Sequence, residues 1–308
     1  MGDRRATLPM SNQVLIGDDA REKRIGLLAG WGRFPLVVAR SLREQGYELY
    51  GLGIKDHADP ELRSLCHSYA EIGVAKMGAQ IRFFRRHGVR LATMAGKIHK
   101  VLMLQRFAWL KHLPDWTCVQ TFYPHFITKT KDRTDDSMLN AVVDAYAKRG
   151  ITFAPATNFA PELLVKQGTI AGRAPSRSEW IDIAFGWRLA KEMGRLDVGQ
   201  SVAVKGQAAI AIEAIEGTDQ CIRRAGELCP SGGFVVVKVA KPQQDMRFDV
   251  PTIGAGTIET LAAAGARLLA IEADRTIVID QDDVASLAKR HGITVLAIND
   301  ALAERKAA

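Results

Sequence analysis

The sequence predicts an α/β protein with two domains. Apolar runs of strand length alternate with amphipathic stretches of helical length from residue 24 to residue 297, which is the pattern of βαβ units. The length of 308 residues is about twice that of a typical domain, so each half can bury its own core. We expect an N-terminal Rossmann-like domain with a parallel sheet, a C-terminal domain with a mixed sheet and helices, and an active site in the cleft between them.

The composition is that of a soluble globular protein, with 47% hydrophobic and 25% charged residues. No run of about 18 apolar residues occurs, so the sequence predicts no transmembrane helix. Residues 1–22 mix both charges and hold no apolar core; we expect a disordered tail rather than a signal peptide, and a cytoplasmic protein. The four cysteines form no CxxC pair, which favours reduced, mostly buried thiols.

The net charge of +8 and the pI of about 9.4 favour a partner that carries negative charge. The basic residues are spread over several short groups and form no single long stripe, so nucleic acid is not favoured. Phosphorylated small molecules and anionic membrane surfaces fit the same charge.

In the N-terminal half, apolar runs bounded by glycine and proline predict strands, and apolar residues at helical spacing predict helices. The acid pair Asp135 and Asp136 either holds a cation or, as we expect, caps the last of these helices. The predicted strands are residues 24–29, 47–54, 89–95, 116–121 and 150–155, and the predicted helices are residues 36–44, 79–87, 102–112 and 137–148.

A glycine turn of Gly30, Trp31 and Gly32 follows the first strand and opens its helix. The turn either receives a phosphate, nucleotide or sugar at the helix N-terminus, or serves only as a tight structural turn. As a dinucleotide fingerprint it is weak, because the position of the third glycine is Pro35. Lys97 follows another strand of this half and either reaches the same cleft or is simply solvated.

In the C-terminal half, shorter strands alternate with helices. The predicted domain boundaries are residues 1–22 for the tail, 23–160 for the N-terminal domain, 161–177 for a linker rich in Gly, Pro and basic residues, and 178–308 for the C-terminal catalytic domain. The predicted strands are residues 200–205, 208–214, 234–239, 267–272, 276–279 and 294–297, and the predicted helices are residues 178–193, 220–228, 256–264 and 282–291.

Two strands of this half run out into clusters of charged residues. The strand at 208–214 leads into three carboxylates around a Gly-Thr turn, and the strand at 234–239 leads into lysines, aspartates and an arginine. If the βαβ connection through residues 220–228 makes the two strands neighbours, their carboxyl ends form a binding site. The alternative is a pair of solvated strand ends.

Strand geometry limits how the first cluster is arranged. Side chains alternate between the two faces of a strand, so Glu213 and Glu216 cannot share a face if the strand stays regular. Gly217 favours a strand that ends between them and a turn that swings Glu216 and Thr218 over its end. Asp219 is then expected to cap the helix that follows.

The chemistry of these side chains indicates attack of water on phosphorus. Several oxygen ligands without a Cys or His cluster favour Mg²⁺ or Mn²⁺, and we expect Glu213, Asp245 and Asp249 as the metal ligands. The cations would neutralise phosphate charge. The expected catalytic residues are Asp249, Asp245 and Glu216. The expected substrate-binding residues are Gly30, Trp31, Gly32, Lys97, Glu213, Gly217, Thr218, Asp219, Lys238, Lys241, Arg247 and Thr252.

At these residues the chain resembles the LpxI family of bacterial UDP-2,3-diacylglucosamine hydrolases of lipid A synthesis, over about residues 23–300. The resemblance implies a Mg²⁺-dependent cytoplasmic enzyme that splits its substrate into UMP and 2,3-diacylglucosamine 1-phosphate. It also implies an essential acid in the segment 245–249, without telling which one. The motifs that carry the resemblance are residues 29–35 (AGWGRFP), Asp135 and Asp136 with their helix, residues 212–219 (IEAIEGTD) and residues 241–254 (KPQQDMRFDVPTIG).

Two other functions are left open by the sequence: a nicotinamide-dependent oxidoreductase, and a non-catalytic module that binds a nucleotide or an anionic lipid. The expected partners are a glycolipid nucleotide and, transiently, the inner membrane surface, and a homodimer is left open. Aromatic residues beside Lys or Arg mark two candidate membrane segments, which are otherwise ordinary core helices. These are residues 101–113 and the helix around Trp180, Phe185 and Trp187.

Overall fold

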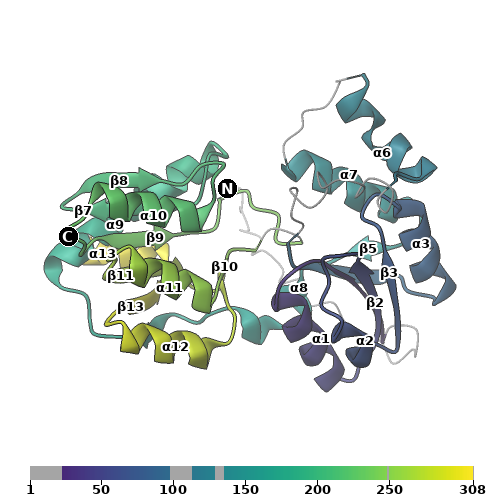
Figure 1. Ribbon diagram of the computed structural model, residues 1–308, viewed down its shortest axis with the longest axis horizontal. Coiled ribbons are helices and arrows are strands. Elements are labelled where there is room, and N and C mark those ends of the chain that lie inside the picture. Colours follow the sequence, from purple (N-terminus) through teal and green to yellow (C-terminus); the bar gives the residue numbers. More distant parts are fainter. Residues whose placement is uncertain (1–22, 98–112, 129–134, 248–249, 308) are drawn as a thin grey trace, which may run out of the picture. The chain divides into compact units, whose positions relative to one another are not determined.

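The computed structural model describes residues 23–97, 113–128, 135–247 and 250–307. The chain divides into two compact units, with the boundary between residues 154 and 155 (Figure 1). None of the described helices is long and apolar enough to span a membrane.

The N-terminal unit is built on a parallel sheet of five strands. Its central strands are buried, as expected for a parallel sheet that helices cover. The strand order is β3 (Ser68–Ile72), β2 (Glu48–Ile54), β1 (Arg24–Ala29), β4 (Leu91–Ala95) and β5 (Thr152–Phe153). The helices are α1 (Phe34–Glu44), α2 (Leu62–Leu65), α3 (Met77–Arg86), α6 (Trp116–Phe126) and α7 (Asp135–Ala147).

Three elements of this unit differ from the prediction, of which the shortest is the four-residue helix α2, which was not predicted. Strand β3 was not predicted, because it lies at the sheet edge, is only half-buried and contains no apolar run. Residues 116–121 are helical rather than extended. The Asp115 side chain caps α6 by accepting the backbone N–H of Cys118 at 3.0 Å, and this local signal prevails over the β-branched and aromatic residues that suggest a strand. The predicted helix 102–112 lies outside the described residues.

The C-terminal unit is built on a mixed sheet of six strands. The three central strands are parallel, and antiparallel strands flank them on both sides. The order is β6 (Gly168–Ala171), β13 (Thr294–Ile298), β11 (Leu268–Glu272), β9 (Val235–Lys238), β7 (Ser201–Lys205) and β8 (Ala208–Ile212). The helices are α8 (Ala156–Phe159), η1 (Pro161–Leu163), α9 (Arg177–Arg195), α10 (Thr218–Leu228), α11 (Ala255–Ala263), α12 (Gln281–Arg290) and α13 (Asp300–Ala307), and β10 (Thr252–Ile253) pairs with β12 (Ile277–Val278) in a separate two-stranded sheet.

This unit has three layers, because successive side chains of a strand point to opposite faces of the sheet. Val235 and Val237 of β9 pack with the core under α9 and α13, whereas Val236 packs with the core under α10, α11 and α12 (Figure 1). The two predicted fold features, a parallel N-terminal sheet and a mixed C-terminal sheet with helices, are therefore confirmed.

Residues 161–177 are not simply a linker. They contain β6, which pairs antiparallel with β13 at the edge of the six-stranded sheet. The strand is only four residues long and begins with a glycine, so its composition resembles that of a loop. The residues 276–279, predicted to join the main sheet, instead contribute β12 to the two-stranded sheet.

Helix α9 packs on one face of the six-stranded sheet and also contacts the turn of the β7–β8 hairpin. Trp187 is buried in the core, and Trp180 and Phe185 pack partly buried against the same core, so this helix is a core element rather than an interfacial segment. The buried Asp182 accepts the backbone N–H groups of Gly206 at 3.0 Å and Gln207 at 2.6 Å, and so holds the turn of the β7–β8 hairpin.

A capping box begins α9. The Ser176 side chain accepts the N–H of Glu179, and the Glu179 carboxylate accepts the N–H of Ser176 at 2.7 Å. Arg173 donates two further hydrogen bonds to this carboxylate, each at 2.7 Å. These bonds, above all those from Arg173, lower the pKa of Glu179 to about 2.

We predict that Glu179→Gln weakens this helix start and removes a pH dependence of stability. Because the folded pKa lies below the ordinary value of 4.5, the carboxylate stabilises the fold above pH 4.5 and loses that contribution as the pH falls toward 2. The variant should be less stable by about 0.5–1 kcal/mol at neutral pH and should lack this part of the acid loss. Urea unfolding across the pH range measures both, and an acid loss identical in the two proteins would contradict the prediction.

Candidate functional site

A cluster of buried polar side chains lies where β8 and β9 end. These two strands are parallel to each other but are not neighbours, since β7 lies between them and is antiparallel to both. The prediction of adjacent strands is therefore wrong. The signal for the correct pairing was the two-residue turn Gly206–Gln207, whose φ values of 59° mark a tight hairpin. The carboxyl ends of β8 and β9 nevertheless lie at the same edge of the sheet, with the first residue of β7 between them.

Thr218 connects the members of this cluster. Its hydroxyl donates to Glu213 Oε1 at 3.1 Å and accepts from Lys238 Nζ at 2.7 Å, and it lies 3.3 Å from the hydroxyl of Ser201. Glu213, Lys238 and Ser201 are 7%, 5% and 1% exposed. Among the described residues Glu213 Oε2 has no hydrogen-bond partner. The structure thus brings three of the predicted residues together and adds Ser201, which the sequence reasoning missed although it stands opposite Lys238 in the strand register.

Glu216 lies apart from this cluster. Its carboxylate accepts the N–H of Ala214 at 3.1 Å and is paired with Arg224 of α10. Hydrogen bonding from its own backbone N–H, together with the charge of Arg224, lowers the pKa of Glu216. Strand β8 ends at Ile212, before Glu213, whereas Gly217 suggested an end between Glu213 and Glu216. Of the two side chains expected over the strand end, Thr218 alone lies there among the described residues.

Gly217, and not Asp219, occupies the N-cap position of α10. Gly217 is the N-cap residue, with a φ of 81° that favours glycine, and no side chain caps the helix there. Asp219 stands exposed in the first turn instead. The first N–H groups of this helix consequently remain available to an anion near Lys238.

Side chains of the loop after β9 form ion pairs and hydrogen bonds both within the loop and with the segment that follows α9. Arg247 donates to both carboxylate oxygens of Asp245, at 2.9 and 3.0 Å from Nε, and these hydrogen bonds lower the pKa of Asp245. Lys241 Nζ pairs with Asp197 at 2.6 Å. The Thr252 hydroxyl donates to the carbonyl of Val250 at 2.9 Å. Asp249 lies outside the described residues.

A second buried carboxylate, which the sequence reasoning missed, anchors the start of this loop. Glu272 ends β11, is 5% exposed, and accepts the N–H of Ala240 at 2.7 Å and the Nζ of Lys191 at 2.7 Å. Lys191 and Arg275 supply the opposite charge. The rule that pointed to Lys238, a charge at the end of a buried strand, also applies to Glu272.

The described residues do not by themselves form a metal centre. No three His, Cys, Asp or Glu side chains among them gather closely enough to hold an ion. Both oxygens of Asp245 are engaged by Arg247, and the hydroxyl that Glu213 binds also binds a lysine. Of the two predicted ligands that lie within the described residues, Glu213 and Asp245, Glu213 alone offers a carboxylate oxygen without a described partner.

The predicted residues of the N-terminal unit lie at the switch point of its sheet. Residues 30–32 follow β1, and Lys97 follows β4. These two strands are neighbours at the point where the strand order of the sheet reverses, and open α/β sheets bind ligands at this point. Trp31 and Lys97 exchange backbone hydrogen bonds, at 2.7 and 2.9 Å, and both side chains are exposed. The backbone at Gly30 lies so close to Lys97 that a Cβ would stand 2.6 Å from the Lys97 carbonyl oxygen. Gly32 has a φ of 106° and open space around it.

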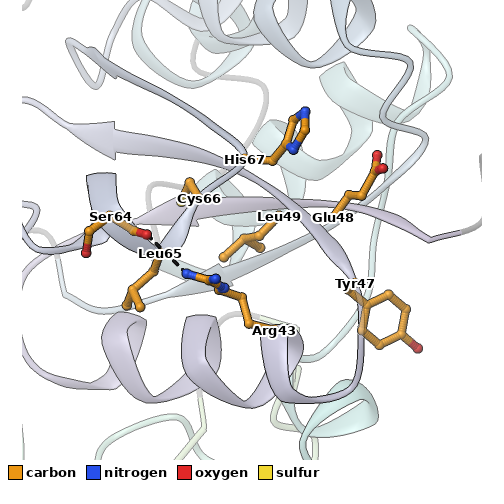
Figure 2. Close-up of a pocket in the computed structure, with 8 residues that line it drawn as sticks. All are labelled: Arg43, Tyr47, Glu48, Leu49, Ser64, Leu65, Cys66 and His67. Carbon is orange, nitrogen blue, oxygen red and sulfur yellow. Dashed lines mark hydrogen bonds between the residues drawn. The ribbon is translucent and has the colours of Figure 1, made fainter.

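A cavity of about 260 Å³ opens at the opposite edge of the same sheet (Figure 2). Glu48 and His67 lie at the amino ends of β2 and β3, and Arg43 donates to the carbonyl of Ser64 at 3.1 Å (Figure 2). Burial raises the pKa of the Cys66 thiol to about 12, which disfavours the reactive thiolate form. We assign no function to this cavity.

Together these features define a two-domain α/β protein with a Rossmann-like N-terminal unit and a polar cluster at strand ends in the C-terminal unit. The model of the LpxI N-terminal domain matches residues 24–163, and the model of the LpxI C-terminal domain matches residues 166–296. The chain belongs to the LpxI family.

A relative from Caulobacter agrees with this assignment. A protein of Caulobacter vibrioides named UDP-2,3-diacylglucosamine pyrophosphatase LpxI is 29% identical over 284 residues, which cover 90% of this chain and 98% of that protein. Among solved structures, precorrin-6A reductase is 12% identical over 90% of this chain and 87% of its own, with a TM-score of 0.31. A GalE-like L-threonine dehydrogenase of Cupriavidus necator is 9% identical over 91% and 88%, with a TM-score of 0.32. Likeness at this level carries no functional argument.

We predict that Thr218→Val destabilises the C-terminal unit by about 1–3 kcal/mol, because it leaves the buried Lys238 and Glu213 without the hydroxyl that joins them. Thr218→Ser keeps the hydroxyl and should lose much less. Urea unfolding followed by circular dichroism measures the difference. Equal stability of the two variants would show that the hydroxyl does not join the cluster.

We predict that Gly30→Ala costs about 1–3 kcal/mol, because the new methyl group would meet backbone atoms that cannot move aside. Gly256→Ala in α11 is the matched control: its Cβ would meet no heavy atom within 4 Å, so it should be neutral or stabilising. Thermal melts compare the two. A Gly30→Ala protein with the same melting temperature as the wild type would contradict the close approach of the loop after β1 to the loop after β4.

Proposed function

We propose that the chain hydrolyses the pyrophosphate of UDP-2,3-diacylglucosamine to UMP and 2,3-diacylglucosamine 1-phosphate (lipid X), a step of lipid A biosynthesis. The observation that carries the proposal is membership of the LpxI family over both domains, together with the similarity to the Caulobacter pyrophosphatase over nearly all of its length. A pyrophosphate ester of a nucleoside is also the class of ligand that the features of both units suit.

Hydrolysis of a phosphoanhydride needs groups that neutralise the charge of the phosphates as it develops. Lys238 and the first N–H groups of α10 present positive charge at one strand edge. Lys241 and Arg247 would add to it from the loop after β9. In the N-terminal unit, the exposed Trp31 ring and Lys97 suit the base and the phosphates of the nucleotide.

A carboxylate is needed to orient and deprotonate the attacking water. Asp245 is held by Arg247 through both oxygens, which suits a residue that positions the arginine. Asp249 then takes the role of general base. Glu216, paired with Arg224, contributes by fixing the turn that begins α10.

A requirement for Mg²⁺ or Mn²⁺ belongs to the same proposal. Since the described residues do not form a complete site for the ion, we assign no step of the reaction to it. Product analysis by mass spectrometry, with UDP-2,3-diacylglucosamine as substrate and with Mg²⁺ or EDTA added, tests both parts. Formation of UMP and lipid X only with the divalent ion is expected. Unchanged substrate in both reactions would overturn the proposed activity. Equal rates with Mg²⁺ and with EDTA would show that the reaction needs no divalent ion.

We predict that Asp249→Asn lowers turnover by about a hundredfold or more, as expected for loss of a general base. Asp245→Asn should lower it less, because the amide can still accept a hydrogen bond from Arg247. Asp274→Asn is the control, since Asp274 is exposed and pairs only at the surface with Lys166. The three rates are compared on folded proteins. If the Asp245→Asn enzyme turns over more slowly than the Asp249→Asn enzyme, Asp245 is the general base and Asp249 is not.

A further inference from the structure

The described residues carry an unusual concentration of exposed apolar side chains around α6. Six of the eleven large apolar side chains that are exposed lie between residues 113 and 127. We call the five of them on α6 and its C-cap the α6 face. They are Trp116, Val119, Tyr123, Phe126 and Ile127.

These five side chains lie on one side of the helix. At helical spacing they fall within an arc of about 100° around the axis. The buried residues of α6, Cys118 and His125, lie on the opposite side. The helix therefore buries one side against the described residues of the unit and exposes an apolar side opposite to it. Apolar patches of this kind mark interaction surfaces.

The fold holds this helix firmly. Asp115 caps α6 through Cys118 and also accepts the N–H of Ala79 in the first turn of α3 at 3.1 Å. Its own N–H donates to the carbonyl of Ala75 at 3.1 Å. The α6 face is thus presented on a fixed support, and its exposure does not result from a frayed end.

The helix that packs against α6 carries exposed basic residues. Arg82, Arg85 and Arg86 of α3, which packs against α6, are exposed, and within the described residues none of them forms an ion pair. The described segment that contains α6, residues 113–128, holds a single acid, Asp115. That acid is already engaged by backbone N–H groups.

A second copy of the chain is a poor occupant for this face. Eleven residues of helix span about 16 Å, so the face offers on the order of 200 Å², against about 800 Å² per partner in a stable protein interface. Trp, Tyr and Phe beside basic groups instead match the boundary between lipid headgroups and acyl chains.

We propose that the α6 face docks the protein on an anionic membrane surface, with its aromatic rings among the headgroups and the arginines of α3 facing the lipid charge. The inference rests on the proposed function, because a diacylated substrate resides in a membrane and must be taken from it. It places the contact on α6, whereas the aromatic residues of α9 belong to the core.

The test uses the full chain and vesicles of phosphatidylcholine with or without about one third phosphatidylglycerol. The wild type should sediment with the anionic vesicles and much less with the neutral ones. Trp116→Ser/Tyr123→Ser should bind about tenfold more weakly, because it removes two rings from the interface. Leu196→Ser/Leu228→Ser is the matched control: both leucines are exposed, at 60% and 63%, on the other unit, and binding should be unchanged.

Two further variants separate the components of the contact. Arg82→Gln/Arg85→Gln should weaken binding to anionic vesicles and reduce its salt dependence. Trp116→Phe should bind like the wild type but lose part of the fluorescence quenching by brominated lipids, which shows that this ring enters the bilayer. Equal binding by wild type and Trp116→Ser/Tyr123→Ser, or no binding by the wild type, would overturn the proposal. A change in that variant from dimer to monomer would instead assign the face to a second copy and overturn the membrane contact.

Hydrolysis of a water-soluble, short-chain substrate analogue distinguishes this inference from the proposed function. Trp116→Ser/Tyr123→Ser should hydrolyse the analogue at the wild-type rate. If neither the wild type nor the variant hydrolyses the analogue or the natural substrate, but vesicle binding still depends on the α6 face, the proposed activity is wrong and the proposed membrane contact is supported. If hydrolysis occurs and binding does not depend on α6, only the surface fails.

Discussion

A lysine at the end of a strand that is buried on both faces must find polar partners, and much of the C-terminal unit is arranged around that requirement. Strand β9 supplies side chains to both cores, so its last residue, Lys238, leaves the apolar region with little access to solvent. Burial of a charge without partners is costly. Thr218 provides a partner because Gly217 allows α10 to begin just over the strand end. The N-terminus of α10, which no side chain caps, and the lysine are therefore brought together by one constraint.

The neighbouring strand meets the same requirement with the opposite charge. Glu272 at the end of β11 is as buried as Lys238 and is satisfied by Lys191 and by the N–H of Ala240. That N–H belongs to the chain immediately after β9, so the carboxylate fixes where the loop toward Asp245 departs. Two adjacent strand ends of opposite charge thus hold different segments: Lys238 binds the hydroxyl at the start of α10, and Glu272 holds the loop after β9.

Much of this arrangement could be predicted from the sequence, and the errors have physical causes. Period and glycine punctuation located most strands and helices, since local backbone preferences decide them. The position of β7 between β8 and β9 was missed because the βαβ rule was applied without the hairpin signal at Gly206–Gln207. The strand predicted at 116–121 shows the limit of β-propensity: Asp115 satisfies the N-terminal N–H groups, and a helix forms. Pairings such as that of Asp245 with Arg247, or Glu216 with Arg224, depend on side-chain conformations that the order of residues does not fix.

The bond between Asp182 and the hairpin turn has a consequence for how this unit folds. Helix α9 and strands β7 and β8 are continuous in sequence, and their contacts close only short loops. The parallel pairings of β9, β11 and β13 each require a crossover through a helix, which closes a longer loop and is slower. We expect α9 and the β7–β8 hairpin to form first during folding. Strand β9 then pairs with β7, and the remaining strands of the sheet follow.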